Sequence, residues 1–496
     1  MVTARDIAKI GTALMLVIIL SEWIFFTSGK IIGRWIRSRT AQRRELLLSR
    51  SATERKQQSQ LGVSDSKKAS SSTSLDEDWE KVSSSDKTPP KVDSSKADSS
   101  FNGIIGFFHP FANAGGGGER VLFAAIHATQ QRYPDALCVV YTGDHDVTKE
   151  QILGTAQTRF NITLNTAAVA FLHLTTRDYV LASRYPRLTL LGQSLGSLVL
   201  GWDAFNLVVP DVIIDTMGYA FVLALTKWLF PWMPTCAYVH YPTISTDMID
   251  SLSDKTGSQG LNAGSGKGPV GKMKQFYWLL FANVYSWAGG RIDVVMTNST
   301  WTQRHITSLW TRSRATSGKK VPISIVYPPC AVEELHKTIP VDSNSERQRN
   351  RTLLYISQFR PEKMHATIIS SFIKYLKTLD ANAEKPKLIL AGSVRDDQDE
   401  KGVYKLRLQA QEIKDHVEFV VNGKWTQMLE LLRTSSIGVN GMWNEHFGIG
   451  VVEYQAAGLV SVVNDSGGPG EDIVVDVDGL PTGMYFLLRV IAFMRA

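Results

Sequence analysis

From residue 101 onward, short apolar runs alternate with helical patterns, and this alternation limits the fold more than any other feature of the chain. The first series starts with GIIGFFH and a helix expected from about Glu119 to Arg132, and it ends with ISIVYP. A second series runs through TLLYIS, KLILAG, VEFVV, SIGVNG and VSVVND, with a helical pattern after each of the first four runs. Strands and helices in this order predict parallel sheets covered on both faces.

The polar stretch VDSNSERQRNR, residues 341–351, separates the two series. The chain has 496 residues, of which 44% are hydrophobic, so it is long enough for two domains with their own cores. We therefore predict an α/β protein of two Rossmann-like domains that face each other across a cleft, one over residues 101–345 and one over 350–478. Residues 479–496 form an atypical end, for which a truncated product is one interpretation.

An apolar stretch lies before the first series. Residues 7–26, IAKIGTALMLVIILSEWIFF, have about the roughly 20 residues that a bilayer-spanning helix needs. The basic residues Lys30, Arg34, Arg37, Arg39, Arg43 and Arg44 follow it, against Arg5 and Lys9 at its start. This bias predicts a single-pass transmembrane anchor with the bulk of the chain in the cytosol, and a cleaved signal peptide is the alternative. Residues 27–100 would be a basic flank followed by a disordered linker rich in Ser, Lys and Asp.

The overall composition argues against several classes of partner. The net charge is +7, but the basic residues are dispersed except beside the expected anchor, so we expect no nucleic-acid partner. The three cysteines are widely spaced and form no CxxC pattern, which argues against a disulfide framework or a zinc site. A reducing compartment is the simpler interpretation.

Three other stretches need an assignment. The Gly- and Ser-rich residues 251–272 are predicted to be a mobile surface loop, with a substrate lid as the alternative. The apolar stretches 219–233 and 275–288 are predicted to be helices. The first is too short for a membrane span and contains Lys227, so it is expected to pack on the sheet or lie at a membrane surface.

Four consecutive glycines stand between the first expected strand and the first expected helix: Gly115, Gly116, Gly117 and Gly118. In parallel sheets, ligands bind beyond the carboxyl ends of the strands, where helix N-termini present N–H groups. The letters match neither GxGxxG nor GxxxxGK[ST], which excludes the dinucleotide and P-loop motifs. A turn that brings bare backbone against a sugar or a phosphate remains, with a plain flexible turn as the alternative.

The stretch GMWNEHFGIGVVEYQAAG, residues 441–458, places Glu445 and Glu453 on either side of a helix start. Eight positions of helical rise span about 12 Å, comparable to the reach from a hexose across a diphosphate to a ribose. A ligand along this start would meet Glu445 at its sugar and Glu453 at its ribose. The N–H groups near Phe447, Gly448 and Ile449 would meet the phosphates. Two glutamates at this spacing also arise by chance, so the surrounding sequence decides whether they indicate a binding site.

That context resembles a known family. The pattern E-x7-E followed by AAGLVSVVNDSGGP is similar to the nucleotide-sugar site of retaining glycosyltransferases of family 4, which have the GT-B fold. The set FFHPFANAGGGGERVL, AYVHYPTIS, VMTNSTWT, SQFRPEK and NEHFGIGVVEYQAAG resembles the eukaryotic GDP-mannose-dependent alpha-1,2-mannosyltransferases of asparagine-linked glycosylation. The resemblance covers about residues 103–478.

The resemblance implies a function, partners and a location. A retaining enzyme would move mannose from GDP-mannose onto a dolichol-diphosphate oligosaccharide at the cytosolic face of the endoplasmic reticulum membrane. Residues 101–345 would be the acceptor domain and 350–478 the nucleotide-sugar domain, with other mannosyltransferases as further partners. No cofactor or metal is expected, because cations and helix dipoles can stabilise the leaving diphosphate. The alternatives are a catalytically inactive GT-B scaffold in a membrane mannosyltransferase complex and a soluble GT-B synthase, which the anchor disfavours.

The family's roles can be carried onto matching positions. Lys363 would neutralise the donor diphosphate, with Arg360 as the second cation, although many relatives place the arginine where this chain has Gln358. Glu445 and His240 are the candidate catalytic residues, since His240 matches a histidine that contacts the donor sugar. The alternatives are solvated charges at a helix start and a structural histidine beside a strand. Secondary candidates are His109 and Glu119 beside the glycine turn, with Asn298 and Trp301 expected to shape the cleft.

Overall fold

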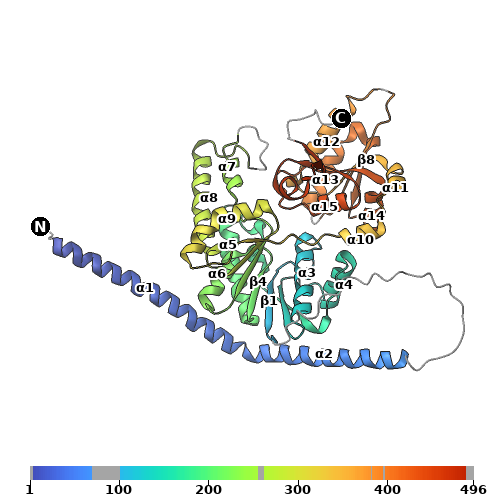
Figure 1. The fold of residues 1–496 in the computed structure, drawn as a ribbon. Coiled ribbons are helices and arrows are strands. Elements are labelled where there is room, and N and C mark those ends of the chain that lie inside the picture. The colour runs from blue at the N-terminus through green and yellow to red at the C-terminus, as the bar shows by residue number, and fades with distance from the viewer. Residues whose placement is uncertain (1–3, 70–100, 255–261, 381, 395–396, 487–496) are drawn as a thin grey trace. The chain divides into compact units, whose positions relative to one another are not determined.

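The computed structural model describes residues 4–69, 101–254, 262–380, 382–394 and 397–486 (Figure 1). The chain divides into two compact units. The first unit comprises the residues up to Ala237 together with Arg291–Asp293, and the second comprises Tyr238–Gly290 and the residues from Val294. The domain limits at residues 345 and 350 stay predictions.

Five parallel strands of the first unit lie in the spatial order β3-β2-β1-β4-β5. They are β1 (Ile104–Phe108), β2 (Leu137–Thr142), β3 (Val169–His173), β4 (Val212–Asp215) and β5 (Thr235–Val239). The last residues of β5 belong to the second unit, where β6 (Val294–Thr297) and β7 (Ser324–Ile325) complete a seven-stranded sheet. The order of the strands reverses between β1 and β4, so their carboxyl ends form a switch point of the kind at which α/β folds bind ligands.

The helices of the first unit bury apolar side chains against this sheet. The long ones after β1 are α3 (Gly117–Arg132), α4 (Lys149–Phe160), α5 (Thr189–Leu207) and α6 (Ala220–Leu229). Phe123 and Ile126 of α3 pack in one core with Phe107 of β1 and Val140 of β2. The predicted helix at 219–233 is confirmed as α6, whereas the strand β3 and the helices α4 and α5 were not predicted.

The N-terminal helix α1 (Ala4–Arg39) packs on α6 through two glycines. A Cβ atom at Gly33 would lie 2.0 Å from the Leu229 carbonyl oxygen, and one at Gly29 would lie 2.5 Å from that of Trp228. This helix contains the predicted transmembrane anchor at residues 7–26. Within the described part of the chain, however, no helix has the length and apolar character that crossing a bilayer requires.

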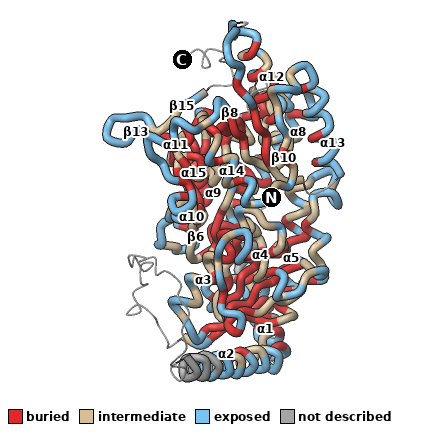
Figure 2. The backbone as a smooth tube through the Cα atoms, turned by 90° about the vertical axis from the view of Figure 1, so that its right-hand side faces the viewer, coloured by how far each residue is buried: buried red, intermediate tan, exposed pale blue. Residues whose placement is uncertain are grey.

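A second N-terminal helix, α2 (Ala41–Ala69), takes up part of the predicted disordered linker. Ser51 donates a hydrogen bond to the Ala167 carbonyl at 2.6 Å, and Arg55 donates to that of Pro134 at 2.6 Å. Most of residues 41–60 in this helix are exposed (Figure 2). Residues 51–69 are thus helical where the sequence predicted a disordered linker, and the contacts of Ser51 and Arg55 hold the first part of this segment. Residues 70–100 lie outside the described residues.

The second unit contains a six-stranded parallel sheet in the order β10-β9-β8-β11-β12-β15. Its strands are β8 (Asn350–Ile356), β9 (Lys387–Gly392), β10 (Val417–Val421), β11 (Ser435–Asn440), β12 (Val460–Asn464) and β15 (Gly483–Phe486). The helices between them are α12 (His365–Leu376), α13 (Asp397–Gln409), α14 (Trp425–Thr434) and α15 (Ile449–Ala456). Apolar cores lie on both faces of the sheet, one with α14 and α15 and the other with α12 and α13. The strand and helix pattern predicted for this half is confirmed.

In the rest of the second unit, the predicted helix at 275–288 is confirmed as part of a longer helix, whereas the predicted loop and chain end differ from the structure. Its helices there are α7 (Thr246–Ser251), α8 (Gly268–Gly289), α9 (Thr300–Thr316), α10 (Val332–Thr338) and α11 (Ser343–Arg347). Helix α8 begins inside the predicted loop 251–272, of which residues 255–261 lie outside the described residues. Beyond residue 478, β14 (Leu480–Pro481) pairs with β13 (Asp476–Val477), and β15 joins the sheet.

Candidate active site

Lys363 and Glu445, which lie 82 positions apart in the sequence, form the centre of the candidate site in the second unit. The Lys363 Nζ donates to Glu445 Oε2 at 2.5 Å and also lies 3.2 Å from the Met442 sulfur. Lys363 ends a short 3₁₀ turn after β8, and its carbonyl accepts a hydrogen bond from the buried Tyr355 hydroxyl at 2.7 Å. Glu445 follows β11, the strand next to β8. The sheet therefore brings two separately predicted residues into contact at neighbouring strand ends.

The electrostatics of this pair keep the carboxylate charged. Burial acts to raise the pKa of Glu445, but the positive charge and hydrogen bond of Lys363, together with the Asn440 side chain, lower it overall. Desolvation lowers the pKa of the neighbouring His446 to about 4, so its imidazole is neutral near pH 7. The site thus places an ammonium, a carboxylate and a neutral imidazole side by side.

Two glycines after β12 hold the backbone of Glu445. The Gly468 N–H donates to the Glu445 carbonyl at 2.8 Å. Gly467 has a φ of 67°, and a Cβ atom there would lie only 2.3 Å from the same carbonyl oxygen. The SGGPG stretch therefore fits against the Glu445 turn because it has no side chains there. The sequence analysis quoted these letters as part of the resemblance but assigned them no role.

Helix α15 begins where the sequence predicted, directly after Gly448, which has a φ of 102°. The Phe447 side chain is buried and packs with Val451 and Ile473. Glu453 lies on this helix next to Tyr454, whose hydroxyl accepts a hydrogen bond from the Ile356 N–H at 2.6 Å. This contact joins α15 to the end of β8. The donor-binding roles of Phe447, Gly448, Ile449 and Glu453 stay predictions.

Arg360 begins the turn that ends at Lys363. Its guanidinium lies 3.8 Å from Glu362 and within electrostatic range of the Tyr241 hydroxyl. Arg360 and Lys363 therefore belong to one short turn, as the sequence spacing indicated. The role of Arg360 as a second diphosphate cation stays a prediction.

Aromatic rings flank the His446 side chain. Tyr241 stacks on it with ring centroids 5.0 Å apart, and Trp301 lies at 5.3 Å. His240 is the residue before Tyr241, directly after β5, and its ring packs against Tyr238 at 4.9 Å. The segment that contains His240 thus borders the site through Tyr241, whereas the catalytic role of His240 itself stays a prediction. Trp301 lies beside the site, and its expected role in shaping the cleft stays a prediction. The sequence analysis missed His446.

The glycine turn belongs to the first unit and forms the start of α3. Gly115 has a φ of 72°, and a Cβ atom there would lie 2.2 Å from the guanidinium of Arg159. The Gly116 N–H donates to Glu119 Oε2 at 2.6 Å, and the helix begins at Gly117, two positions before the predicted start. The carboxylate of Glu119 therefore caps a helix whose first residues are glycines. That Gly115, Gly116, Gly117 and Gly118 bind an acceptor or phosphate stays a prediction.

The other Glu119 oxygen, Oε1, lies 3.6 Å from Nε2 of the fully buried His109, whose Nδ1 lies 2.7 Å from the Thr216 hydroxyl. The fully buried Asp215, at the end of β4, accepts the N–H groups of Met217 and Gly218. Burial raises the pKa of Asp215 to about 7. A polar cluster thus occupies the switch point between β1 and β4.

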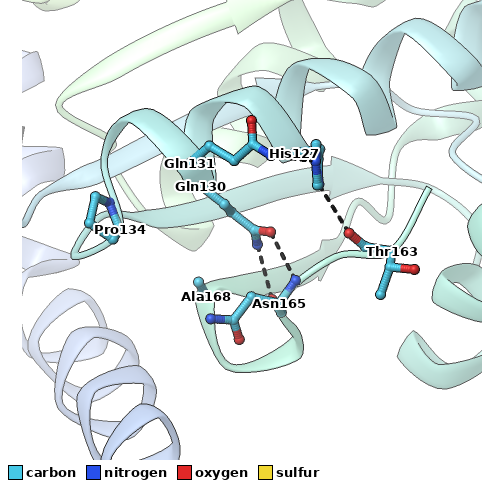
Figure 3. A pocket seen from close by; sticks show the side chains of 7 residues that line it. All are labelled: His127, Gln130, Gln131, Pro134, Thr163, Asn165 and Ala168. Carbon is cyan, nitrogen blue, oxygen red and sulfur yellow. Dashed lines mark hydrogen bonds between the residues drawn. The ribbon is translucent and has the colours of Figure 1, made fainter. Parts of the chain in front are cut away.

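A separate open pocket of about 220 Å³ lies elsewhere in the first unit (Figure 3). Hydrogen bonds across it join Gln130 to Asn165 and the His127 ring to the Thr163 carbonyl. The pocket contains none of the predicted site residues. In the described part of the chain, no group of three or more His, Cys, Asp or Glu side chains could hold a metal ion.

The chain matches two family models and resembles solved structures. Residues 102–310 match the family described as ALG11 mannosyltransferase N-terminus, and residues 338–483 match the family of glycosyl transferases group 1. A solved alpha,alpha-trehalose 6-phosphate synthase from Burkholderia multivorans is similar with a TM-score of 0.53 at 13% identity, over 79% of this chain and 89% of that one. Fold and sequence together define the class: a glycosyltransferase with the GT-B fold.

Curated relatives narrow the class further. A protein of Neurospora crassa named GDP-Man:Man(3)GlcNAc(2)-PP-Dol alpha-1,2-mannosyltransferase is 54% identical, with 97% of this chain and 87% of that protein covered. The Homo sapiens protein of the same name is 45% identical, with 77% of this chain and 76% of that protein covered. The chain belongs to the ALG11 mannosyltransferase family.

Proposed function

We propose that this chain is a retaining mannosyltransferase that moves mannose from GDP-mannose, in alpha-1,2 linkage, onto a dolichol-diphosphate-linked oligosaccharide. The names of its relatives support the donor, the linkage and the acceptor. The observation that carries the proposal is the Lys363–Glu445 contact beside the start of α15. It joins a cation for a leaving diphosphate to a carboxylate for the sugar at one end of the sheet.

In this proposal the chain stabilises charge separation. As the bond between the mannose C1 and the diphosphate oxygen breaks, Lys363, Arg360 and the N–H groups at the start of α15 bind the negative diphosphate. Glu445 is held in its charged form and stabilises the positive charge that develops on the sugar ring. The acceptor hydroxyl attacks C1 on the face from which GDP leaves, and its proton passes to the departing phosphate oxygen. No residue acts as a covalent nucleophile, and no metal or cofactor takes part.

We further propose that the protein works at the cytosolic face of the endoplasmic reticulum membrane and contacts other mannosyltransferases there. The apolar stretch at residues 7–26 and the basic residues after it support attachment through the N-terminus. Two sequon asparagines, Asn161 and Asn350, are exposed and can report the side of the membrane. Glycan on either one in cells would place the domains in the lumen and contradict this location.

The test measures mannose transfer by membranes that contain the chain, given GDP-mannose and the lipid-linked acceptor. Lys363→Ala and Glu445→Ala should each lower transfer at least 100-fold, because each removes a charge that stabilises the transition state. Lys374→Ala, an exposed lysine on α12, is the matched control and should transfer at the normal rate. Near-normal transfer by either site variant would remove that residue from the mechanism. No transfer by the unmutated chain would favour the inactive scaffold.

A further inference from the structure

Asp247 of α7 makes three polar contacts with one carboxylate oxygen, Oδ2. This atom accepts hydrogen bonds from Asn444 Nδ2 at 2.7 Å and from Trp301 Nε1 at 3.2 Å. It also lies 3.3 Å from Nε2 of the buried His305. The three partners come from two separate parts of the sequence, and two of them border the candidate site.

Asn444 is the residue directly before Glu445, and it is buried in the left-handed conformation with a φ of 52°. Asparagine adopts this conformation more readily than most residues, but it still needs local hydrogen bonds to hold it. The Ser466 hydroxyl accepts from its backbone N–H at 2.8 Å, and Asp247 accepts from its side chain. Asp247 therefore helps to fix the backbone that directs the Glu445 side chain toward Lys363.

The second set of contacts leads to His446. His305 lies with its Nδ1 at 2.7 Å from the Thr246 hydroxyl, so its other ring nitrogen faces Asp247. The Trp301 ring packs on His305 at 4.3 Å and reaches His446 at 5.3 Å. Asp247 thus orients the indole that forms one wall beside His446.

Asp247 is well suited to accept these bonds. Burial acts to raise the pKa of Asp247, but the hydrogen bond and charge of His305 and the bonds from Trp301 and Asn444 lower it overall. The carboxyl group is thus a charged acceptor, which makes stronger hydrogen bonds than a neutral one. Its side chain is 32% exposed, so its loss leaves no large cavity.

We infer that Asp247 is a positioning residue for the transfer reaction: it holds Asn444 and Trp301, and through them Glu445 and His446, in the geometry that the reaction needs. This inference rests on the proposed function. Asp247 acts through its neighbours, so its removal should slow the chemical step more than it weakens donor binding.

The test compares Asp247→Ala with the unmutated chain and with Asp250→Ala, an exposed carboxylate on the same helix. Asp247→Ala should lower kcat about 10- to 100-fold, the effect expected from losing hydrogen bonds to a charged group, while the KM for GDP-mannose changes less than about threefold. Asp247→Asn keeps an acceptor oxygen and should recover part of the loss. Asp250→Ala should behave like the unmutated chain.

A double-mutant cycle separates positioning from general damage. Asn444→Ala should also lower kcat, and the loss in the double variant should be smaller than the product of the two single losses, because both substitutions remove the contact between Asp247 and Asn444. Fully multiplicative losses, or a normal kcat in Asp247→Ala, would overturn the inference. If Asp247→Ala unfolds at a markedly lower temperature, the kcat values of Asp247→Asn and Asn444→Ala test the inference by the same criteria. Failure of the unmutated chain to transfer mannose would instead refute the proposed function.

Discussion

The substitution Gly467→Ala tests whether the backbone contact at Glu445 matters for catalysis. The added Cβ would lie 2.3 Å from the Glu445 carbonyl oxygen and 2.9 Å from its nitrogen, so the Glu445 turn must move. Alanine at a φ of 67° costs about 1–2 kcal/mol in backbone conformation alone. A shift of the turn of about 1 Å is enough to lower a reaction rate about 100-fold. We therefore expect a modest loss of stability and a large loss of transfer.

Gly318→Ala is the matched control. Gly318 has a φ of 72°, but a Cβ atom there has no heavy atom within 4 Å. It should show the same backbone cost of about 1–2 kcal/mol and a normal rate of transfer. Urea unfolding gives the free energies, and transfer of labelled mannose to the lipid-linked acceptor gives the rates. Equal rates in the two variants would refute the reasoning that the SGGPG stretch positions Glu445.

Two other predictions concern stability. Desolvation lowers the pKa of the buried His365 from 6.5 to about 4, so the folded state binds this proton less well than the unfolded state does. The contribution of His365 to the free energy of unfolding is therefore complete above pH 6.5. It falls by about 3 kcal/mol in all as the pH drops toward 4. His365→Phe should flatten the pH dependence of the unfolding free energy over this range, and an unchanged slope would contradict the assignment. Gly33→Ala should weaken the packing of α1 on α6 by about 1–3 kcal/mol and speed trypsin cleavage within α1, because its Cβ meets the Leu229 carbonyl. Gly154→Ala, on an open face of α4, should leave the cleavage rate unchanged.

The sequence predicted five of the six strands of the second sheet, because they are short apolar runs and a clear helical pattern follows four of them; it did not predict β15. It failed for β3 and α5 in the first unit. The run VAFLH of β3 is short, and the glycines and serines of α5 weaken its helical pattern. Residues 51–69 are helical although their polar composition predicted a disordered linker, because composition contains no sign of the contacts from Ser51 and Arg55 near the start of this segment.

The sequence likewise predicted some residues of the candidate site and gave no sign of others. Lys363 and Glu445 could be named from local motifs, but their contact depends on β8 and β11 lying side by side. Asp247 had no local signal, because its partners Trp301 and Asn444 lie 54 and 197 positions away in the sequence. Gly467 and Gly468 could be read in the sequence, but their role in holding the Glu445 backbone depends on the Glu445 carbonyl lying beside them in the fold.

The most direct test of the proposed function is transfer by the unmutated chain in membranes supplied with labelled GDP-mannose and the dolichol-diphosphate oligosaccharide. The product should carry mannose that an alpha-1,2-specific mannosidase releases, and a chelator should leave the rate unchanged. No labelled product under these conditions, or labelled mannose that resists the mannosidase, would contradict the proposed function.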